Sequence, residues 1–209
     1  SFKHIDGIDG LAPTIAILAI VNVGVLFFFV ERYFYVGICL IGLGSLISFL
    51  IYNLSKKSNK IFMGDTGSMI LGYIIAVLSM RILSYKMERL SYLPLDTKNL
   101  VLLVIAILFV PLFDTGRIFL VRLFKGKSPF KADRNHIHHL LIDYYNLSHR
   151  RTSFYIGGFN FAFIILFYFL STKFNYWVMS GVMLLTIICL LVYFQVIDAK
   201  RTKKMELEK

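Results

Sequence analysis

The sequence predicts an all-α, polytopic transmembrane helix bundle with about six spans in its 209 residues. Hydrophobic residues make up 57% of the chain, above the roughly 45–50% of soluble domains, and only 17% of residues are charged. Mean hydropathy is +0.71. Crossing about 30 Å of hydrocarbon takes roughly 20 apolar residues per helix. Six stretches approach that length, at 11–30, 34–54, 67–85, 99–121, 155–172 and 176–196.

Short connections join the first two and the last two spans, at 31–33 and 173–175. They predict tight helical hairpins within one integral-membrane domain that covers residues 1–209. The fourth span contains Pro111, and Asp114 and Arg117 follow it at a spacing of three residues, which places both on one helical face. For this pair we favour an orienting ion pair over direct catalysis.

Lysine and arginine are distributed asymmetrically. Residue 3, the segments 55–66 and 117–154 and the tail 197–209 carry 17 of the 23 basic residues. By the positive-inside rule, the loops 55–66 and 123–154 and the tail 197–209 are expected to be cytoplasmic. Topology and attraction to anionic lipid headgroups account for the net charge of +11, so nucleic-acid binding is not expected.

The first polar motif, Asp6-Gly7-Ile8-Asp9-Gly10, precedes the first span. Its carboxylates lie three residues apart, so a turn would direct both to the same side, and nearby helix N-terminal amides could hold a phosphate. The alternative is a pair of helix N-caps, for which Asp and Gly are ordinary residues.

The second motif, Phe62-Met63-Gly64-Asp65-Thr66-Gly67-Ser68, enters the third span. It combines an aromatic ring that can stack on a base with a carboxylate in a Gly/Ser turn. Mg²⁺ prefers hard oxygen ligands and is usually shared between one or two carboxylates and substrate phosphates. We therefore favour a metal and phosphate site, with Asp65 as a simple helix cap the alternative.

The third motif, Arg134-Asn135-His136-Ile137-His138-His139, lies in the long loop 123–154. A zinc site is disfavoured, because on a helix only His136 and His139 share a face and no cysteine lies in the loop. These imidazoles, beside Arg134, could instead bind a pyrophosphate. The alternative is a solvated polar loop.

Together the three motifs resemble the signatures of the polyprenyl-phosphate N-acetylhexosamine-1-phosphate transferases, glycosyltransferase family 4, and the His-Ile-His-His form resembles the undecaprenyl-phosphate N-acetylglucosamine branch. The matching segments are Asp6–Ala12, Ile61–Ser68 and Ser128–His139. The resemblance implies Mg²⁺-dependent transfer, with Mn²⁺ as a substitute, of a sugar 1-phosphate from a UDP-N-acetylhexosamine to a membrane polyprenyl phosphate, with release of UMP. It also implies a multi-pass protein of the bacterial inner membrane with a cytoplasmic active site, a homodimer as one option, and a role in teichoic acid or lipopolysaccharide synthesis.

The resemblance also assigns roles to residues. Asp65 is expected to bind Mg²⁺ and to act with Asp6 and Asp9 as the catalytic carboxylates, while Phe62 and Gly64 hold the uracil. The substrate phosphates are expected to meet Arg134, His136, His138 and His139.

Two departures from the family pattern shape these expectations. The paired-aspartate motif is absent from these residues, so the chain is expected to be the C-terminal part of a longer transferase and inactive alone. Lys3 stands where the family commonly has an asparagine, which favours a catalytically inactive relative as one alternative. The other alternative is a membrane transporter, which would place charges near mid-span instead of at one membrane face.

Overall fold

The computed structural model describes residues 8–55, 57–124, 126 and 136–207. Within them every regular element is helical, which confirms the predicted all-α class. The helices are α2 (Leu11–Phe29), α3 (Tyr33–Asn53), α4 (Gly64–Leu83), α5 (Met87–Leu90), α6 (Leu100–Ile107), α7 (Phe109–Phe124), α8 (Ile137–Tyr145), α9 (His149–Lys173) and α10 (Tyr176–Leu207), with short 3-10 turns at Lys57–Asn59 and Thr97–Asn99.

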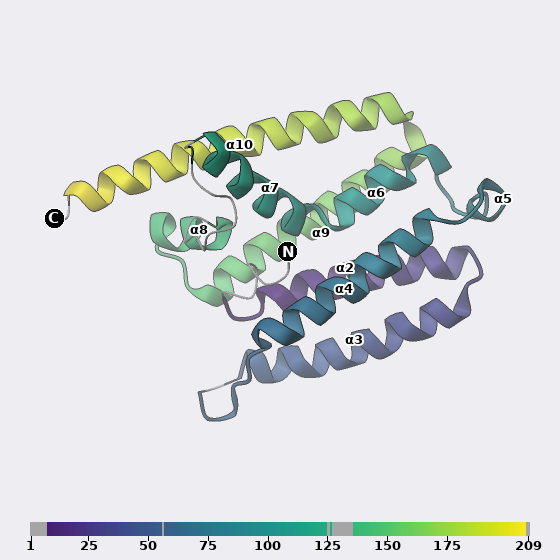
Figure 1. The fold of residues 1–209 in the computed structure, drawn as a ribbon, viewed down its shortest axis with the longest axis horizontal. Helices are drawn as coiled ribbons and strands as arrows, with labels where there is room; N and C mark the ends of the chain where they lie inside the picture. The colour runs from purple at the N-terminus through teal and green to yellow at the C-terminus, as the bar shows by residue number, and fades with distance from the viewer. Residues whose placement is uncertain (1–7, 56, 125, 127–135, 208–209) are drawn as a thin grey trace.

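Five of these helices are long and apolar enough to span a membrane, and the bent pair α6–α7 makes six if it counts as one span. Figure 1 shows the long helices lying side by side, with α8 at one end of the bundle and α5 at the other. We call the end that holds Ile8–Gly10, residues 57–65 and α8 the motif end. Helix α8 lies within the segment 123–154, which the sequence predicts as a long loop.

Helix α2 lies at the centre of the bundle. In its apolar stretch 56% of the residues are buried, against 11% for α3 and 17% for α10. In lipid, apolar burial alone does not drive helices together, so close packing of small residues has to contribute. Ala12, Ala16 and Ala19 line one side of α2 and are fully buried. A Cβ added at Gly157 of α9 would lie 2.8 Å from Cγ2 of Thr14, so glycine permits this close approach of α9 to α2.

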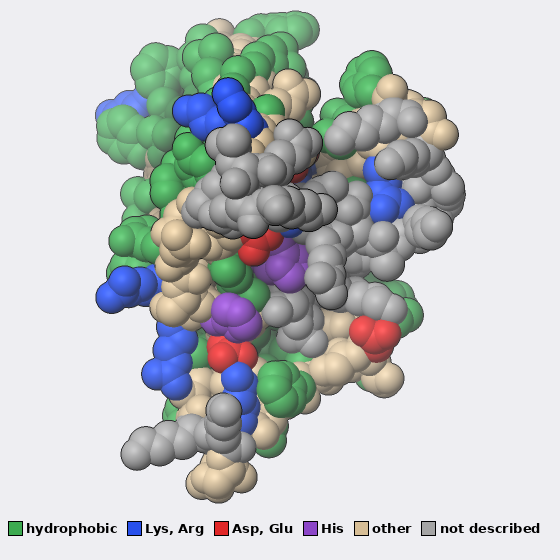
Figure 2. Space-filling view, turned by 90° about the vertical axis from the view of Figure 1, so that its left-hand side faces the viewer, with side chains coloured by type: hydrophobic (Ala, Val, Ile, Leu, Met, Phe, Trp, Pro, Cys, Tyr) green, Lys and Arg blue, Asp and Glu red, His purple; other side chains and the backbone are tan. Residues whose placement is uncertain are grey.

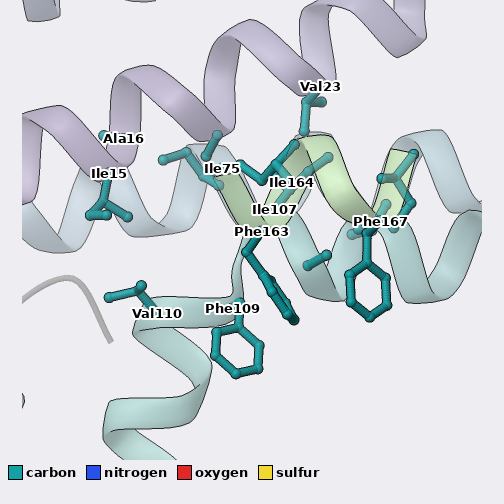
Figure 3. Packing of buried hydrophobic residues seen from close by; sticks show 14 of the residues in the cluster. Ile15, Ala16, Val23, Ile75, Ile107, Phe109, Val110, Phe163, Ile164 and Phe167 are labelled. Carbon is teal, nitrogen blue, oxygen red and sulfur yellow. The ribbon is translucent and has the colours of Figure 1, made fainter. Parts of the chain in front are cut away.

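The hydrophobic core lies between α2 and the helices α6, α7 and α9. Figure 3 shows Ile15 and Val23 of α2 in one buried apolar cluster with Ile107 and the α9 residues Phe163 and Ile164. The rings of Phe163 and Phe109 lie 4.4 Å apart between centroids and continue this core into α7.

The fourth predicted span is broken. Helices α6 and α7 meet at Leu108 with a bend of 70°. Pro111 explains the position, because its ring has no N–H to give to Ile107, four residues earlier, and crowds that carbonyl. The buried side chain of Asn160 in α9 donates to the Ile107 carbonyl instead, at 3.4 Å.

The last helix is longer than predicted. The sequence ends the sixth span at 196 and places 197–209 in a tail, but α10 continues to Leu207. No glycine or proline follows Gly181, and lysine, arginine, methionine and leucine favour helix. An ion pair of 2.7 Å between Arg201 and Asp143 also fixes this extension to α8.

Candidate active site at the motif end

The turn of the first motif is held by a buried asparagine. Gly10 adopts a left-handed backbone, with φ of 80°, and begins α2 as its N-cap. Its N–H donates to Oδ1 of Asn53 at 2.7 Å, and Nδ2 of Asn53 donates to the carbonyl of Ile61 at 2.9 Å. Asn53 is only 4% exposed and therefore ties the first motif directly to the segment that leads into the second.

The carboxylate of Asp9 pairs with Lys60 instead of capping α2. Its Oδ2 lies 2.6 Å from Nζ of Lys60, and both side chains are about one-fifth exposed, at 22% and 21%. The same Nζ lies 5.1 Å from the ring centre of Phe62. The carbonyl of Asp9 accepts a 2.6 Å hydrogen bond from the hydroxyl of Ser153 in α9. Residues from three separate segments thus meet around Asp9.

The second motif begins α4. Gly64 has φ of 69°, a left-handed conformation that glycine adopts without strain, and Asp65 lies in the first turn of the helix. There the helix dipole stabilises its negative charge. Asp65 is exposed, and Phe62 is 73% exposed. Solvent can therefore reach both the carboxylate and the aromatic ring.

The third motif is attached to α7 through Asp114. Oδ2 of Asp114 lies 2.7 Å from Nδ1 of His136, and its Oδ1 accepts from the backbone N–H of Ile137 at 2.9 Å. Arg117 lies 3.9 Å from the same carboxylate, which confirms the predicted pairing. All three charged or polar side chains are buried. The ion pair is thus one part of a cluster that fixes the start of α8.

His138 differs from its neighbour. It is 2% exposed, and within the described part of the chain its Nε2 has no hydrogen-bond partner. Burial, reinforced by nearby His139, lowers the pKa of His138 to about 3. It is therefore neutral at physiological pH. His139 is half-buried, and its ring centroid lies 4.2 Å from that of His138.

A metal ion at the motif end would depend on the oxygen and nitrogen donors that its side chains offer. Among residues 8–55, 57–124, 126 and 136–207, no three His, Cys, Asp or Glu side chains come together as a metal cluster. Mg²⁺ needs only one or two carboxylates beside waters and phosphates, and exposed Asp65 is a suitable oxygen donor. Asp6 and Arg134 lie outside the described residues.

An apolar groove begins beside the second motif. It lies between α4 and the α6–α7 break, has a volume of about 600 Å³, and its lining includes Ser68, Gly72, Tyr73, Pro111, Leu112 and Gly116. The hydroxyl of Ser68 donates to the backbone carbonyl of Asp65 at 3.0 Å. The groove therefore opens one helical turn from the Asp65 backbone.

Figure 2 views the side of the molecule that carries the motif end, where histidine side chains lie among acidic and basic ones. Asn53 and Asp114, which fix the motifs there, were not predicted as site residues. Their signal in the sequence is a polar side chain at or near the end of a long apolar run, where it costs free energy unless it is bonded.

Comparison with known proteins supports the resemblance of the motifs. A model of glycosyl transferase family 4 matches residues 1–83. A Bacillus subtilis protein described as a probable undecaprenyl-phosphate N-acetylglucosaminyl 1-phosphate transferase is 35% identical over 161 residues, covering 76% of this chain and 41% of the relative. No solved structure matches.

Two further relatives show the same relationship. A decaprenyl-phosphate N-acetylglucosaminephosphotransferase of Mycobacterium leprae is 32% identical over 72% of this chain and 40% of its own length. An undecaprenyl-phosphate alpha-N-acetylglucosaminyl 1-phosphate transferase of Escherichia coli K12 is 29% identical over 68% of this chain and 37% of its own length. The chain thus spans about two-fifths of the relatives that it matches.

Proposed function

Because this chain belongs to glycosyl transferase family 4, we propose that its protein transfers N-acetylhexosamine 1-phosphate from a UDP-sugar to a membrane polyprenyl phosphate and releases UMP. The relatives named above act on undecaprenyl or decaprenyl phosphate by their descriptions, which supports this acceptor. The product would be the lipid-linked precursor of a cell-envelope polysaccharide.

The observation that carries the proposal is the convergence at the motif end. Asn53 joins the turn at Gly10 to Ile61, and the Asp9–Lys60 pair lies beside Phe62. Phosphoryl transfer needs mainly alignment of two anionic reactants and stabilisation of charge on the transferred group. Carboxylates and basic side chains held together by such contacts are suited to that task.

The residues divide this work. Phe62 is exposed and can stack on the uracil, and the left-handed turn at Gly64 lets a nucleotide approach the backbone. Asp65 would hold Mg²⁺, with Asp6 and Asp9 completing the acidic site. When bound, the metal supplies positive charge that offsets the charge of the substrate phosphates.

The basic side of the site would come from the histidine motif. Arg134, His136 and His139 would donate hydrogen bonds to the phosphates, whereas neutral, buried His138 is suited to shape the wall behind them. The groove between α4 and α7 offers an apolar surface for a polyprenyl chain, and it opens within one helical turn of Asp65. Acceptor phosphate and metal would then lie close to each other.

The test uses membranes that contain the complete gene product. UDP-GlcNAc, undecaprenyl phosphate and Mg²⁺ are supplied and UMP is measured; we expect UMP release that depends on both the lipid and the metal. Asp65→Asn should abolish it, while Glu88→Gln, an exposed carboxylate in α5 at the opposite end, should not. Absence of UMP with every UDP-N-acetylhexosamine tested would overturn the proposal and favour a catalytically inactive relative.

A further inference from the structure

Asp114 makes two short contacts at the start of the histidine motif. One carboxylate oxygen lies 2.7 Å from Nδ1 of His136, and the other accepts from the backbone N–H of Ile137 at 2.9 Å. Asp114 comes from α7, 22 residues before His136. It is 3% exposed, so no water competes for these bonds.

These bonds determine how His136 meets a ligand. A carboxylate at Nδ1 fixes the ring orientation and keeps the proton on that nitrogen, so a phosphate approaching the ring would meet Nε2. Arg117, 3.9 Å away, helps offset the cost of burying the carboxylate.

We propose that Asp114 is a positioning residue that acts through His136 and directs its Nε2 at a substrate phosphate. The inference rests on the proposed transferase function, within which it gives Asp114 a role beyond its ion pair with Arg117. The second carboxylate oxygen, on Ile137, holds the first turn of α8 and with it the direction of His136.

The experiment is a double-mutant cycle in the complete protein, with UMP release as the readout. Asp114→Asn keeps the shape and an oxygen for Ile137 but removes the charge. We expect it to lower kcat/KM roughly 10- to 100-fold, a loss of the size found when the hydrogen-bond partner of a metal-binding histidine is removed. His136→Gln should lose at least as much, and adding Asp114→Asn to it should cause no further loss.

Asp143→Asn is the matched control. Asp143 also anchors α8 through a 2.7 Å ion pair, with Arg201, but does not contact His136 in any described interaction. We expect near wild-type kcat/KM. Losses that multiply in the double variant, or equal losses from Asp114→Asn and Asp143→Asn, would reduce Asp114 to a structural anchor and overturn the inference.

A second readout does not depend on a stable Asp114 variant. In ¹⁵N-histidine NMR, comparison of the wild type with His136→Gln identifies the His136 Nδ1–H proton, which should resonate strongly downfield because of its short bond to a carboxylate. Absence of that signal would overturn the inference. Absence of UMP release by the wild type would instead count against the proposed function.

Discussion

Asn160 of α9 donates its side-chain amide to the backbone carbonyl of Ile107, 3.4 Å away, at the break between α6 and α7. Pro111 leaves that carbonyl without its helical partner, and the site is closed to water because Asn160 is fully buried. A broken helix at membrane depth is tolerated only where such groups are satisfied again. The bend that directs α7, and with it Asp114, thus depends on a residue in another helix.

Asn160→Ala should lower the free energy of unfolding by about 1 kcal/mol, because the Ile107 carbonyl would lose its partner. The loss should shrink in a Pro111→Ala background, where residue 111 regains an N–H for that carbonyl. Denaturant titration in detergent measures the free energy of unfolding of the wild type, the two single variants and the double variant. Equal losses in both backgrounds would contradict this account of the break.

Asn53→Ala should lower the free energy of unfolding by about 2 kcal/mol, because it leaves the buried Gly10 N–H and the Ile61 carbonyl without their partners. UMP release should fall as well, because the two motifs would no longer be joined. Asn22→Ala is the control: Asn22 bonds only to Leu18 of its own helix in the described contacts, so a smaller loss is expected. Similar losses for both variants would argue against a special role of Asn53.

Gly157→Ala should destabilise the protein by roughly 1–3 kcal/mol, because the added methyl group would overlap Cγ2 of Thr14 at 2.8 Å. Thr14→Ser removes that methyl group and should relieve most of the loss in the double variant. A Cβ at Gly158 meets nothing within 4 Å, so Gly158→Ala should be neutral or stabilising. The melting temperatures of these variants in detergent measure the differences in stability.

Stability should fall as pH drops below about 6.5. The pKa of His138 is near 6.5 unfolded and about 3 in the fold, so below 6.5 the unfolded chain binds a proton that the folded chain does not. At pH 5 the loss is about 2 kcal/mol, and at neutral pH it vanishes. Unfolding free energies at pH 7 and pH 5 measure it. His138→Asn should remove this part of the pH dependence, and an unchanged slope would exclude His138 as its source.

The number and position of the spans could be predicted because long apolar runs are almost sufficient to define membrane helices. The 70° bend could not, since Pro111 is compatible with a kink of any size and the outcome depends on Asn160, 49 residues later. The extension of α10 was missed for a related reason. Charged residues mark the membrane boundary, but they do not end a helix.

The candidate site was predictable only as a set of motifs. Carboxylates, histidines and glycine turns at the ends of apolar runs indicate chemistry, whereas the contacts that fix them join residues far apart in sequence. Gly10 with Asn53 and Asp114 with His136 are examples. Such pairs have no local spacing rule, so only packing of the helices identifies them.

Helix α10 has 32 residues, which corresponds to about 48 Å of rod, against about 30 Å of hydrocarbon. Its final turns therefore extend beyond the hydrocarbon into water as a rigid helix, which the ion pair between Asp143 and Arg201 holds against α8. A fluorescent reporter attached to this rigid extension would keep a nearly constant distance from the histidines of the third motif. A reporter on a flexible linker would instead give a distance averaged over many conformations.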